Sequence, residues 1–565
     1  MALAVPSTTA IWHEPPTLSP DDLAITDWPL LSAILHRRGI RTPADVKRFL
    51  YPGELPFGDP MLLPDMHQAV SMIRDALESG ETIGVFGDYD VDGISSTAML
   101  TRALRRMGGS VVPRIPHRVN DGYGLNSKAV RAFASDGCRL LITVDCGSSN
   151  VAEIDLALSL GMKVIVVDHH RVHHELPREI AFISPKRDVN AYPEAELATA
   201  GVAYMLVRAL LGDDEAEMYP LRRTGDRRRC RAIAWREQND RCPWPRAPAT
   251  LESAGIQDPL QDRRDRPARD RRVRHRLVIG PRINAAGRMD SPDLALEWFL
   301  ADDVESSTPY SQQLDRLNRE RQADTKRVTQ EAELQIRMHD DGGGQPALVV
   351  DGRDWSPGVI GIVAGRLAER FNRPAIVISR GPQFSTGSAR TAGEVDIVEA
   401  IRACRDLLER FGGHTAAAGL MIETAKIDRF RQALSNAVLD QLDGELPVRE
   451  LHLDAEVPHE DLSLATVEKL DVLEPCGHGN DRPLFLVRGL RPDRIRTSRD
   501  GKHLLFNVTD RYGKQHQATF FSAGERCGEL MACGMIDAAA DLRRNTWNGR
   551  VSLQLRLTDF RPASG

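Results

Sequence analysis

The stretch GVFGDYDVDG, residues 84–93, decides the fold of the first half of the chain, because a buried-looking apolar run ends there in carboxylates. Asp88, Asp90 and Asp92 fall within five positions. Like charges this close raise one another's pKa unless something positive holds them. The stretch therefore predicts a strand that delivers carboxylates to a bound cation.

The residues that follow this strand predict a tight turn at Gly93 and then a helix that begins near Ser95 or Ser96. Further along, helical stretches at 126–135 and 151–160 separate two more apolar runs. Strands that alternate with helices predict a parallel sheet covered on both faces.

Each of these two later runs also ends in polar side chains that can bind a metal ion. RLLITVD ends at Asp145, and MKVIVVDHH ends at His169 and His170. In a parallel sheet, ligands gather beyond the carboxyl ends of the strands. We therefore expect these three residues to converge with Asp90 and Asp92 on one site.

The types of side chain in this group indicate which ions the site prefers. Carboxylates mixed with imidazoles, without a thiolate, favour Mn²⁺ or Mg²⁺ over a structural zinc ion. Two divalent ions that share a carboxylate would neutralise the crowded aspartates. Taken singly, each aspartate could instead cap a helix, and the histidine pair could simply be exposed. Because the pattern repeats after three strands, we favour the metal site.

These residues carry a resemblance to a known family. DYDVDG, VDCGSSN and VDHH resemble the first three motifs of the DHH phosphoesterases. IPHRVNDGYGLN (115–126) and IGPRINAAGRMD (279–290) narrow the resemblance to the RecJ group of exonucleases specific for single-stranded DNA. DGRDWSPGVIGIVAGRLAERFNRPAIVIS, GSART and FGGHTAAAGL are similar to the DHHA1 domain of that group. LEPCGHGNDRPLF (473–485) is similar to the start of its OB-type domain.

The resemblance implies hydrolysis of single-stranded DNA from the 5′ end to mononucleotides, in DNA repair and recombination, with two Mn²⁺ or Mg²⁺ ions. The catalytic residues that it implies are Asp88, Asp90, Asp92, Asp145, His169 and His170. Asp90 and Asp145 would hold one ion, and Asp92, Asp145 and His169 the other. His170 would face the scissile phosphate, while Asp88 would only orient the ligands.

The same resemblance assigns residues that handle the DNA strand. Arg118 would bind the terminal 5′ phosphate, since a planar guanidinium suits bidentate anion binding, although it could also be an exposed loop cation. Arg282 and Arg288 would line a passage too narrow for a duplex. The remaining expected contacts lie near glycines that allow close approach of a phosphate backbone, and they are Ser388, Arg390 and His414.

The predicted fold class is α/β, with a parallel-sheet DHH domain, a long connecting helix, an α/β DHHA1 domain and a C-terminal β-barrel of the OB type. The expected segments are an N-terminal helical segment at 1–65, the DHH domain at 66–305, an exposed connecting helix at 306–340, the DHHA1 domain at 341–446 and the barrel at 447–565.

One interval, 219–277, does not fit this organisation. It holds 17 arginines, no lysine and eight acidic residues, and neither helical nor strand periodicity survives in it. Read literally, it is a disordered basic insertion. Our preferred hypothesis is translation out of frame. Codons that encode GDRRRCRA (225–232), read one base later, give Gly-Thr-Val-Ala-Asp-Val-Val-Pro, which resembles the family's fourth motif. As written, the chain lacks that motif's aspartate.

Whole-chain properties bound the remaining possibilities. The chain has 565 residues and a net charge of −6, so a nucleic acid would have to be held in a local groove. Eight cysteines without a CxxC pair, and no apolar run long enough to cross a membrane, favour a reduced cytoplasmic setting. Expected partners are single-stranded DNA, a helicase and a single-strand-binding protein. The alternatives are a phosphodiesterase of short oligonucleotides or cyclic dinucleotides, and a catalytically dead DNA-binding relic.

Overall fold

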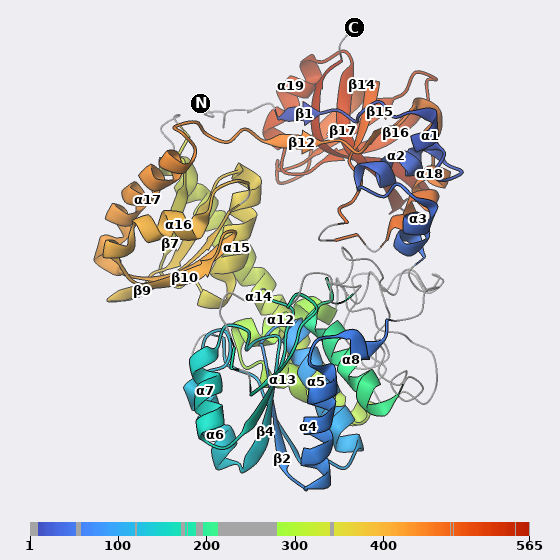
Figure 1. The fold of residues 1–565 in the computed structure, drawn as a ribbon. Coiled ribbons are helices and arrows are strands. Elements are labelled where there is room, and N and C mark those ends of the chain that lie inside the picture. The colour runs from blue at the N-terminus through green and yellow to red at the C-terminus, as the bar shows by residue number, and fades with distance from the viewer. Residues whose placement is uncertain are drawn as a thin grey trace. The chain divides into compact units, whose positions relative to one another are not determined.

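The structure is a computed structural model that describes residues 10–51, 58–118, 121–170, 176–177, 179–187, 192, 196–212, 279–339, 344–391, 393–474, 476–477, 480–547 and 550–563. The chain divides into two compact units, one formed by Met1–Leu55 together with Val448–Gly565, and the other by Pro56–Pro447. Within the described ranges, no helix combines the length and the apolar character needed to span a bilayer. Figure 1 shows the elements of both units.

The second unit begins with a five-stranded sheet in the order β3-β2-β4-β5-β6, in which every pairing is parallel. The strands are β2 (Thr82–Gly87), β3 (Val111–Arg114), β4 (Cys138–Val144), β5 (Lys163–Val167) and β6 (Ala181–Ile183). The helices around it are α4 (Met66–Glu78), α5 (Val91–Arg106), α6 (Ser127–Ser135), α7 (Val151–Ser159) and α8 (Thr199–Leu211). The parallel sheet that the sequence predicted is confirmed.

Side chains that alternate along the strands fill two separate cores, one on each face of this sheet. Ile142 of β4 packs with α4, α5 and α8, while its neighbour Leu141 packs with α6 and α7. Both faces are therefore buried, which is why the strands read as continuous apolar runs.

The predicted start of the helix after β2 was wrong by about one turn, because α5 begins at Val91. Asp90 is its N-cap, and its Oδ1 atom accepts hydrogen bonds from Asp92 N (2.8 Å) and Gly93 N (3.2 Å). A Cβ atom on Gly93 would lie 2.4 Å from the carbonyl oxygen of Asp88, so only glycine allows this close turn. The second half of the acidic motif, from the N-cap Asp90 onward, is therefore the start of the helix.

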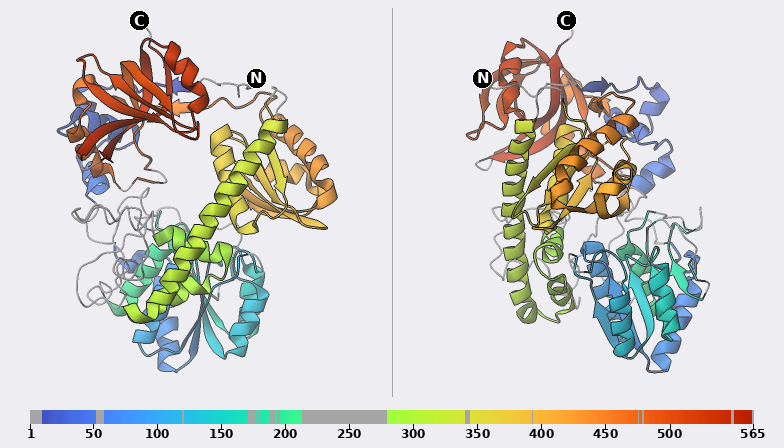
Figure 2. Two further views of the ribbon diagram at one scale, coloured as in Figure 1. Left: turned by 180° about the vertical axis from the view of Figure 1, so that it is seen from behind. Right: turned by 90° about the vertical axis from the view of Figure 1, so that its left-hand side faces the viewer.

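Three further helices follow the parallel sheet, namely α12 (Gly280–Met289), α13 (Asp293–Leu300) and α14 (Val304–His339). Figure 2 shows α14 running from the parallel-sheet lobe to the second lobe of this unit. The expected long helix that bridges two globular parts is present, and it is exposed along much of its surface but buries one apolar stripe. Leu314 lies in the core of the first lobe, and Val328 and Ala332 lie in a core of the second. Each end of α14 therefore packs against one lobe.

The second lobe contains a mixed sheet in the order β10-β11-β9-β8-β7, in which only β7 and β8 pair in parallel. Its strands are β7 (Leu348–Gly352), β8 (Ala375–Ser379), β9 (Phe384–Arg390), β10 (Leu408–His414) and β11 (Ala417–Glu423). The accompanying helices are α15 (Pro357–Phe371), α16 (Ile397–Ala403) and α17 (Ile427–Gln441). This is the α/β domain expected from the sequence.

The first unit contains a closed barrel, because the sheet order β13-β14-β15-β16-β18-β17 is completed by pairing of β14 with β17. Its strands are β13 (Ala455–Glu456), β14 (Phe485–Thr497), β15 (Leu504–Thr509), β16 (Gln515–Phe520), β17 (Ile536–Trp547) and β18 (Arg550–Pro562). Two helices accompany it, α18 (Leu464–Leu470) and α19 (Cys527–Ala532). The predicted C-terminal barrel is confirmed.

The N-terminal segment packs onto this barrel and is not a separate body. Its elements are β1 (Ile11–His13), α1 (Pro20–Leu23), α2 (Pro29–Arg37) and α3 (Pro43–Leu50), and β1 pairs with β12 (Glu450–His452). Ile34, Leu35 and Phe49 share one hydrophobic core with Phe485 and Leu555 of the barrel. The two ends of the chain therefore fold as one unit.

Candidate active site

The acidic and histidine residues predicted to converge lie at the carboxyl ends of the adjacent strands β2, β4 and β5. Ligand atoms of Asp88, Asp90 and Asp145 all lie within 4.8 Å of one another. The same limit encloses ligand atoms of Asp145, His169 and His170. Asp145 thus belongs to both groups, in the position that a shared ligand requires.

Asp145 is held in an unusual backbone conformation, with a φ of 62°. Its N–H donates to Val167 O (3.1 Å), which ties the residue after β4 to the end of β5. Its Oδ1 atom accepts a 2.7 Å hydrogen bond from Thr199 Oγ1 and lies 3.5 Å from His169 Nε2. The carboxylate is therefore both buried and fixed in orientation.

Asp92 is held by the N-terminus of α8. Its two oxygens accept hydrogen bonds from Thr199 N (3.0 Å) and Ala200 N (2.7 Å), at the end of the helix where the dipole favours a negative charge. Burial, and then the charge of Asp90, nevertheless raise the pKa of Asp92 to about 7. The backbone bonds alone therefore do not compensate for the burial of this carboxylate.

Asp168, at the end of β5, is completely buried and orients the histidine pair. Its Oδ1 atom lies 2.7 Å from His170 Nδ1 and accepts a 2.7 Å hydrogen bond from His169 N. Burial acts to raise the pKa of Asp168, but the hydrogen bond with His170 lowers it on balance. With Asp168 ionised, His170 Nδ1 carries the proton that lies between the two groups.

Asp88 contributes a carboxylate oxygen that the surrounding described residues leave without a hydrogen bond. Its Oδ1 atom is buried and has no hydrogen-bond partner among the described residues. Burial, and then the charge of Asp90, raise the pKa of Asp88 to about 7. A buried carboxylate oxygen without a partner, beside other carboxylates and imidazoles, fits hard divalent cations such as Mn²⁺ or Mg²⁺.

A group of arginines from both lobes of this unit lies beside the acidic cluster. Arg118 places its Cζ atom 4.6 Å from the centre of the Tyr89 ring, within the DYDVDG motif. Arg288 of α12 donates from Nη1 to Gly358 O (3.1 Å). Burial, and then the charges of Arg118, Arg321 and Arg390, lower the pKa of Arg288 to about 9. Cations that are crowded in this way form a site for an anion.

Arg390 and Ser388 reach this group from β9 of the second lobe. Arg390 Nη1 donates to Ser388 Oγ (3.1 Å), and a Cβ atom on Gly361 would lie 3.1 Å from Arg390 Nη2. Burial, and then the charge of Arg118, lower the pKa of Arg390. Four of the six residues predicted to contact DNA are therefore adjacent across the two lobes.

The structure places the other two differently. Arg282 is buried and donates from Nε (3.0 Å) and Nη2 (2.7 Å) to Asp315 Oδ1 of α14. His414 is exposed at the end of β10. Arg282 therefore joins α12 to α14, and no interaction of the described residues brings His414 to the acidic cluster.

Two residues that position the site were not anticipated from the sequence. One is Thr199, which contacts both Asp92 and Asp145. The other is Asn284, whose Oδ1 atom accepts a 2.9 Å hydrogen bond from Val91 N at the start of α5. Asn284 lies inside the GPRINAAGR motif, so the motif itself offered a signal, whereas Thr199 belongs to no recognisable pattern. The aberrant interval 219–277 lies outside the described residues.

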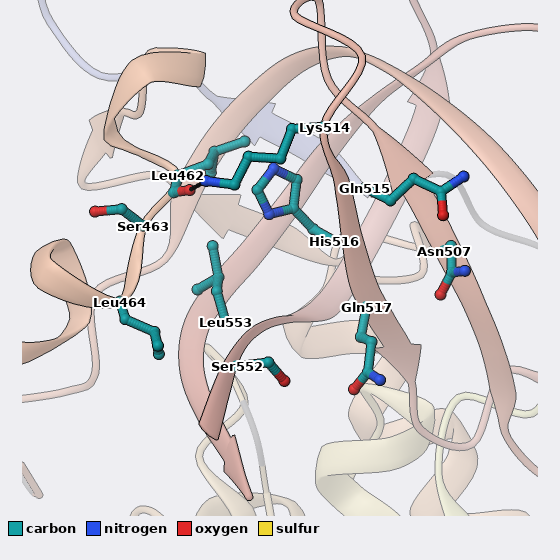
Figure 3. A pocket seen from close by; sticks show the side chains of 10 residues that line it. All are labelled: Leu462, Ser463, Leu464, Asn507, Lys514, Gln515, His516, Gln517, Ser552 and Leu553. Atoms are coloured by element: carbon teal, nitrogen blue, oxygen red, sulfur yellow. Dashed lines mark hydrogen bonds between the residues drawn. The ribbon is translucent and has the colours of Figure 1, made fainter. Parts of the chain in front are cut away.

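The barrel of the first unit carries a cavity of about 490 Å³ between the start of α18 and strands β15, β16 and β18 (Figure 3). The carboxamides of Asn507, Gln515 and Gln517 line it, together with Leu553. Lys514 Nζ donates to Leu462 O (2.9 Å) at its rim. The lining combines hydrogen-bonding amides with an apolar wall.

Comparisons with known proteins place all three parts in one family. Residues 82–224 match the DHH family, N-terminal domain, residues 344–440 match the DHHA1 domain, and residues 453–559 match the RecJ OB domain. The first match ends at Thr224, within the first residues of the aberrant interval 219–277.

Curated relatives and solved structures agree with these matches. The chain is 32% identical to the single-stranded-DNA-specific exonuclease RecJ of Bacillus subtilis (strain 168), over 94% of this chain and 68% of that protein. It is also 32% identical to the RecJ of Thermus thermophilus, over 88% of this chain and 71% of that protein. A crystal structure of the Thermus RecJ in complex with Mn²⁺ matches with a TM-score of 0.76 and 28% identity, over 98% of this chain and 80% of that one. The corresponding Mg²⁺ complex matches with a TM-score of 0.70.

Proposed function

The chain belongs to the RecJ family of DHH phosphoesterases, and from this premise we propose that it hydrolyses single-stranded DNA from the 5′ end with Mn²⁺ or Mg²⁺. The products would be mononucleotides, and the cellular setting would be DNA repair and recombination in the cytoplasm. A helicase that unwinds duplex and a single-strand-binding protein are the partners that such a substrate calls for.

The observation that carries this proposal is the position of the arginine group beside an acidic cluster that needs a cation. Asp88 has a buried oxygen without a partner among the described residues, and Arg118 stacks on Tyr89, the very next residue. Divalent ions would bind to the carboxylates, and the arginines lie beside them. Together they suit a substrate whose phosphates must be held at two points. A DNA strand with a terminal phosphate and a scissile phosphodiester has that character.

The ligand roles are those that the family resemblance implies, and the presence of Asp145 in both groups of ligand atoms supports its role as the shared ligand. We assign Asp90 and Asp145 to one ion, and Asp92, Asp145 and His169 to the other. When bound, such ions activate a water molecule and stabilise the attacking and leaving oxygens of a phosphodiester. Thr199 holds Asp145 in place, as described above, so the shared ligand enters the reaction already oriented.

The roles of the remaining residues concern protons and orientation. Asp168 accepts the Nδ1 proton of His170, so the Nε2 atom of this ring can contact a phosphate oxygen or the leaving group. Tyr123 donates its hydroxyl proton to Asp145 O (3.2 Å) and lies edge-on to the His170 ring. The family resemblance gives Asp88 a role in orienting the ligands, and its unpaired oxygen also lies among the atoms that could hold an ion.

The end specificity would come from Arg118, Arg288, Ser388 and Arg390. Because these groups come from both lobes, a terminal phosphate that they bind stands at a fixed distance from the acidic cluster. A strand with a free phosphorylated end fits this arrangement, whereas an internal segment would meet the guanidinium groups with a single phosphate charge. We propose a structural role for Arg282, which is already paired with Asp315.

The barrel would provide a second, weaker binding site for the DNA strand. Its cavity presents carboxamides that can donate to and accept from base edges, with Leu553 as an apolar surface (Figure 3). Phosphate contacts from basic residues of the barrel would dominate the affinity, so binding should weaken as salt rises.

The aberrant interval favours one second candidate, a folded DNA-binding protein that no longer hydrolyses its substrate. The literal chain lacks the aspartate of the fourth motif, which the family pattern places within 219–277. In that case the described ligands would bind one ion or none, and the strand would bind without release of nucleotides.

One experiment separates the candidates. The full chain is incubated with Mn²⁺ in three parallel reactions. Their substrates are a long 5′-phosphorylated single strand, a dinucleotide and a cyclic dinucleotide, and the mononucleotides released in each reaction are quantified. The variant with Asp90→Asn and Asp145→Asn is the control for a contaminating nuclease. Release from the long strand that the control lacks supports the exonuclease. Release from the short substrates alone supports the smaller phosphodiesterase, and strand binding without release supports the inactive protein.

A further inference from the structure

The first unit contains a small parallel ribbon, far from the acidic cluster in sequence, in which β1 pairs with β12 (Figure 1). Ile11 lies opposite Glu450, Trp12 opposite Leu451, and His13 opposite His452. Successive side chains of a strand point to opposite faces, so the ribbon has an inner and an outer face.

The inner face attaches the ribbon firmly to the barrel. Trp12 and Leu451 belong to one apolar cluster with Leu486 and Ala539 of the barrel strands. Trp12 Nε1 also donates to Asp559 Oδ2 (2.9 Å). The backbone of the ribbon is therefore fixed, and side chains on its outer face project from a rigid support.

The outer face brings two imidazoles and one carboxylate together in solvent. The rings of His13 and His452 stack with centroids 4.4 Å apart and planes 17° from parallel. Glu450 Oε2 lies 3.0 Å from His13 Nε2 and 3.8 Å from His452 Nε2. One oxygen thus lies within reach of both ring nitrogens, and ligand atoms of the three residues all fall within 4.8 Å.

We propose that His13, Glu450 and His452 form a surface site for a first-row transition ion of the Zn²⁺ class. Two imidazoles and one carboxylate are a typical three-ligand set for Zn²⁺, with the remaining position open to water. At metal–ligand distances of about 2.0–2.1 Å, the ligand atoms of a tetrahedral ion stand roughly 3.3 Å apart. The two separations in the structure, 3.0 and 3.8 Å, lie on either side of that value.

A simple ion pair explains this arrangement less completely. A hydrogen bond between Glu450 and His13 accounts for the shorter contact, but it gives no reason for a second imidazole stacked on the first at the register-matched position. Because all three side chains are exposed, they can change rotamer to turn both ring nitrogens toward a shared ion, and such changes are fast.

The site would act as a clip between distant parts of the chain. His13 and Glu450 are 437 positions apart, and β12 begins three residues after the second unit ends at Pro447. An ion bound only in the folded state stabilises that state in proportion to the logarithm of its concentration. Zn²⁺ would therefore hold the N-terminal strand against the segment by which the chain returns to the barrel.

The test measures Zn²⁺ itself on the full chain without an affinity tag. Asp90→Asn and Asp145→Asn are introduced first, so that the acidic cluster does not compete for the ion. Equilibrium dialysis then compares this background with the same chain carrying His13→Gln and His452→Gln. His67→Gln, which removes another exposed histidine, is the matched control. Co²⁺ serves as a second probe, because its visible absorption reports four-coordinate binding.

The expected result is one bound Zn²⁺ that survives His67→Gln and is lost with His13→Gln and His452→Gln, together with loss of the Co²⁺ absorption. Each single change should weaken binding by more than the roughly 10- to 100-fold that removal of an outer partner of a metal ligand costs. Equal Zn²⁺ retention in all variants, or no Zn²⁺ in the background chain at micromolar free ion, would overturn the proposal. Neither outcome bears on the exonuclease proposal, which rests on other residues.

Discussion

Thr199 Oγ1 donates a 2.7 Å hydrogen bond to Asp145 Oδ1, while the backbone N–H of the same residue donates to Asp92. One residue at the start of α8 therefore fixes two carboxylates that arrive from different strands. Its two contacts use different atoms, so a substitution can remove one contact and keep the other.

Thr199→Val should weaken Mn²⁺ binding, because it deletes the hydroxyl that orients Asp145 and keeps both the shape of the side chain and the backbone bond to Asp92. Loss of such a partner typically costs about 10- to 100-fold in metal affinity. Titration of Mn²⁺ followed by electron paramagnetic resonance measures this in the chain as it stands. Thr199→Ser restores the hydroxyl and should bind almost normally. Equal affinity of Val and Ser variants would show that the hydrogen bond does not matter.

Arg118→Ala should abolish the preference for a phosphorylated 5′ end. Because its guanidinium stacks on Tyr89, the side chain is held ready to bind two oxygens of a phosphate. Fluorescence anisotropy with Ca²⁺ present compares the affinity for strands with a 5′ phosphate and with a 5′ hydroxyl. Arg118→Lys keeps the charge without the planar fork and should recover only part of the preference. If the Arg118→Ala variant still preferred a phosphorylated 5′ end, the phosphate would have to bind at other residues.

Arg282→Met should destabilise the second unit and leave strand affinity unchanged. Among the described residues, the substitution leaves the buried carboxylate of Asp315 with its exposed partner Arg319, and breaking a buried pair costs roughly 3 kcal/mol. Urea unfolding measures the loss. Arg316→Met, on the same helix and exposed, should change little, because its ion pair with Glu320 is solvated. A fall in strand affinity at full stability would instead favour a direct DNA contact.

His516→Gln should make the barrel less stable at neutral pH and less sensitive to acid. Burial acts to raise the pKa of Asp510, but the His516 side chain and two backbone N–H groups lower it below its ordinary value of 3.8. A carboxyl with a lowered pKa contributes stability above about pH 4 that is lost as the pH falls through the folded value. Denaturation at a series of pH values should therefore show the two chains converging below about pH 4. Gln515→Ala, on the same strand, should run parallel to the parent at every pH.

The coding sequence across residues 210–280 should show the family's fourth motif in the shifted frame. Restoring that frame would replace 225–232 by Gly-Thr-Val-Ala-Asp-Val-Val-Pro and return an aspartate to the acidic cluster. We expect the restored protein to release mononucleotides much faster than the literal chain at the same Mn²⁺ concentration. A shifted frame without this pattern would refute the hypothesis at once.

The parallel sheet was predictable because its strands are buried on both faces, and the apolar runs ending at Asp88, Asp145 and Asp168 therefore mark both the strands and their carboxyl ends. The start of α5 was not, because Asp90 both caps the helix and belongs to the acidic motif, so its cap function was hidden by its charge. The charge-rich pattern of α14 predicted the long helix but hid its buried stripe, since sparse apolar residues such as Leu314 and Val328 suffice to bury one stripe at each end.

Contacts between residues far apart in the sequence were the other limit. Thr199 lies 54 positions from Asp145, in a stretch without any distinctive spacing. The packing of Phe49 and Phe485 in one core likewise leaves no local trace in either segment. The arginine group was found only because a family resemblance named its members, and charge pattern alone would not have distinguished Arg288 from Arg282.

The left-handed backbone of Asp145, with its φ of 62°, affects how such a protein can lose its activity during evolution. Asparagine adopts this conformation as readily as aspartate and has the same size, so exchanging the two leaves the fold undisturbed. A single substitution can thus silence hydrolysis in a chain that still folds and still grips nucleic acid. Lineages freed from selection for cleavage would retain well-folded, inert copies for a long time.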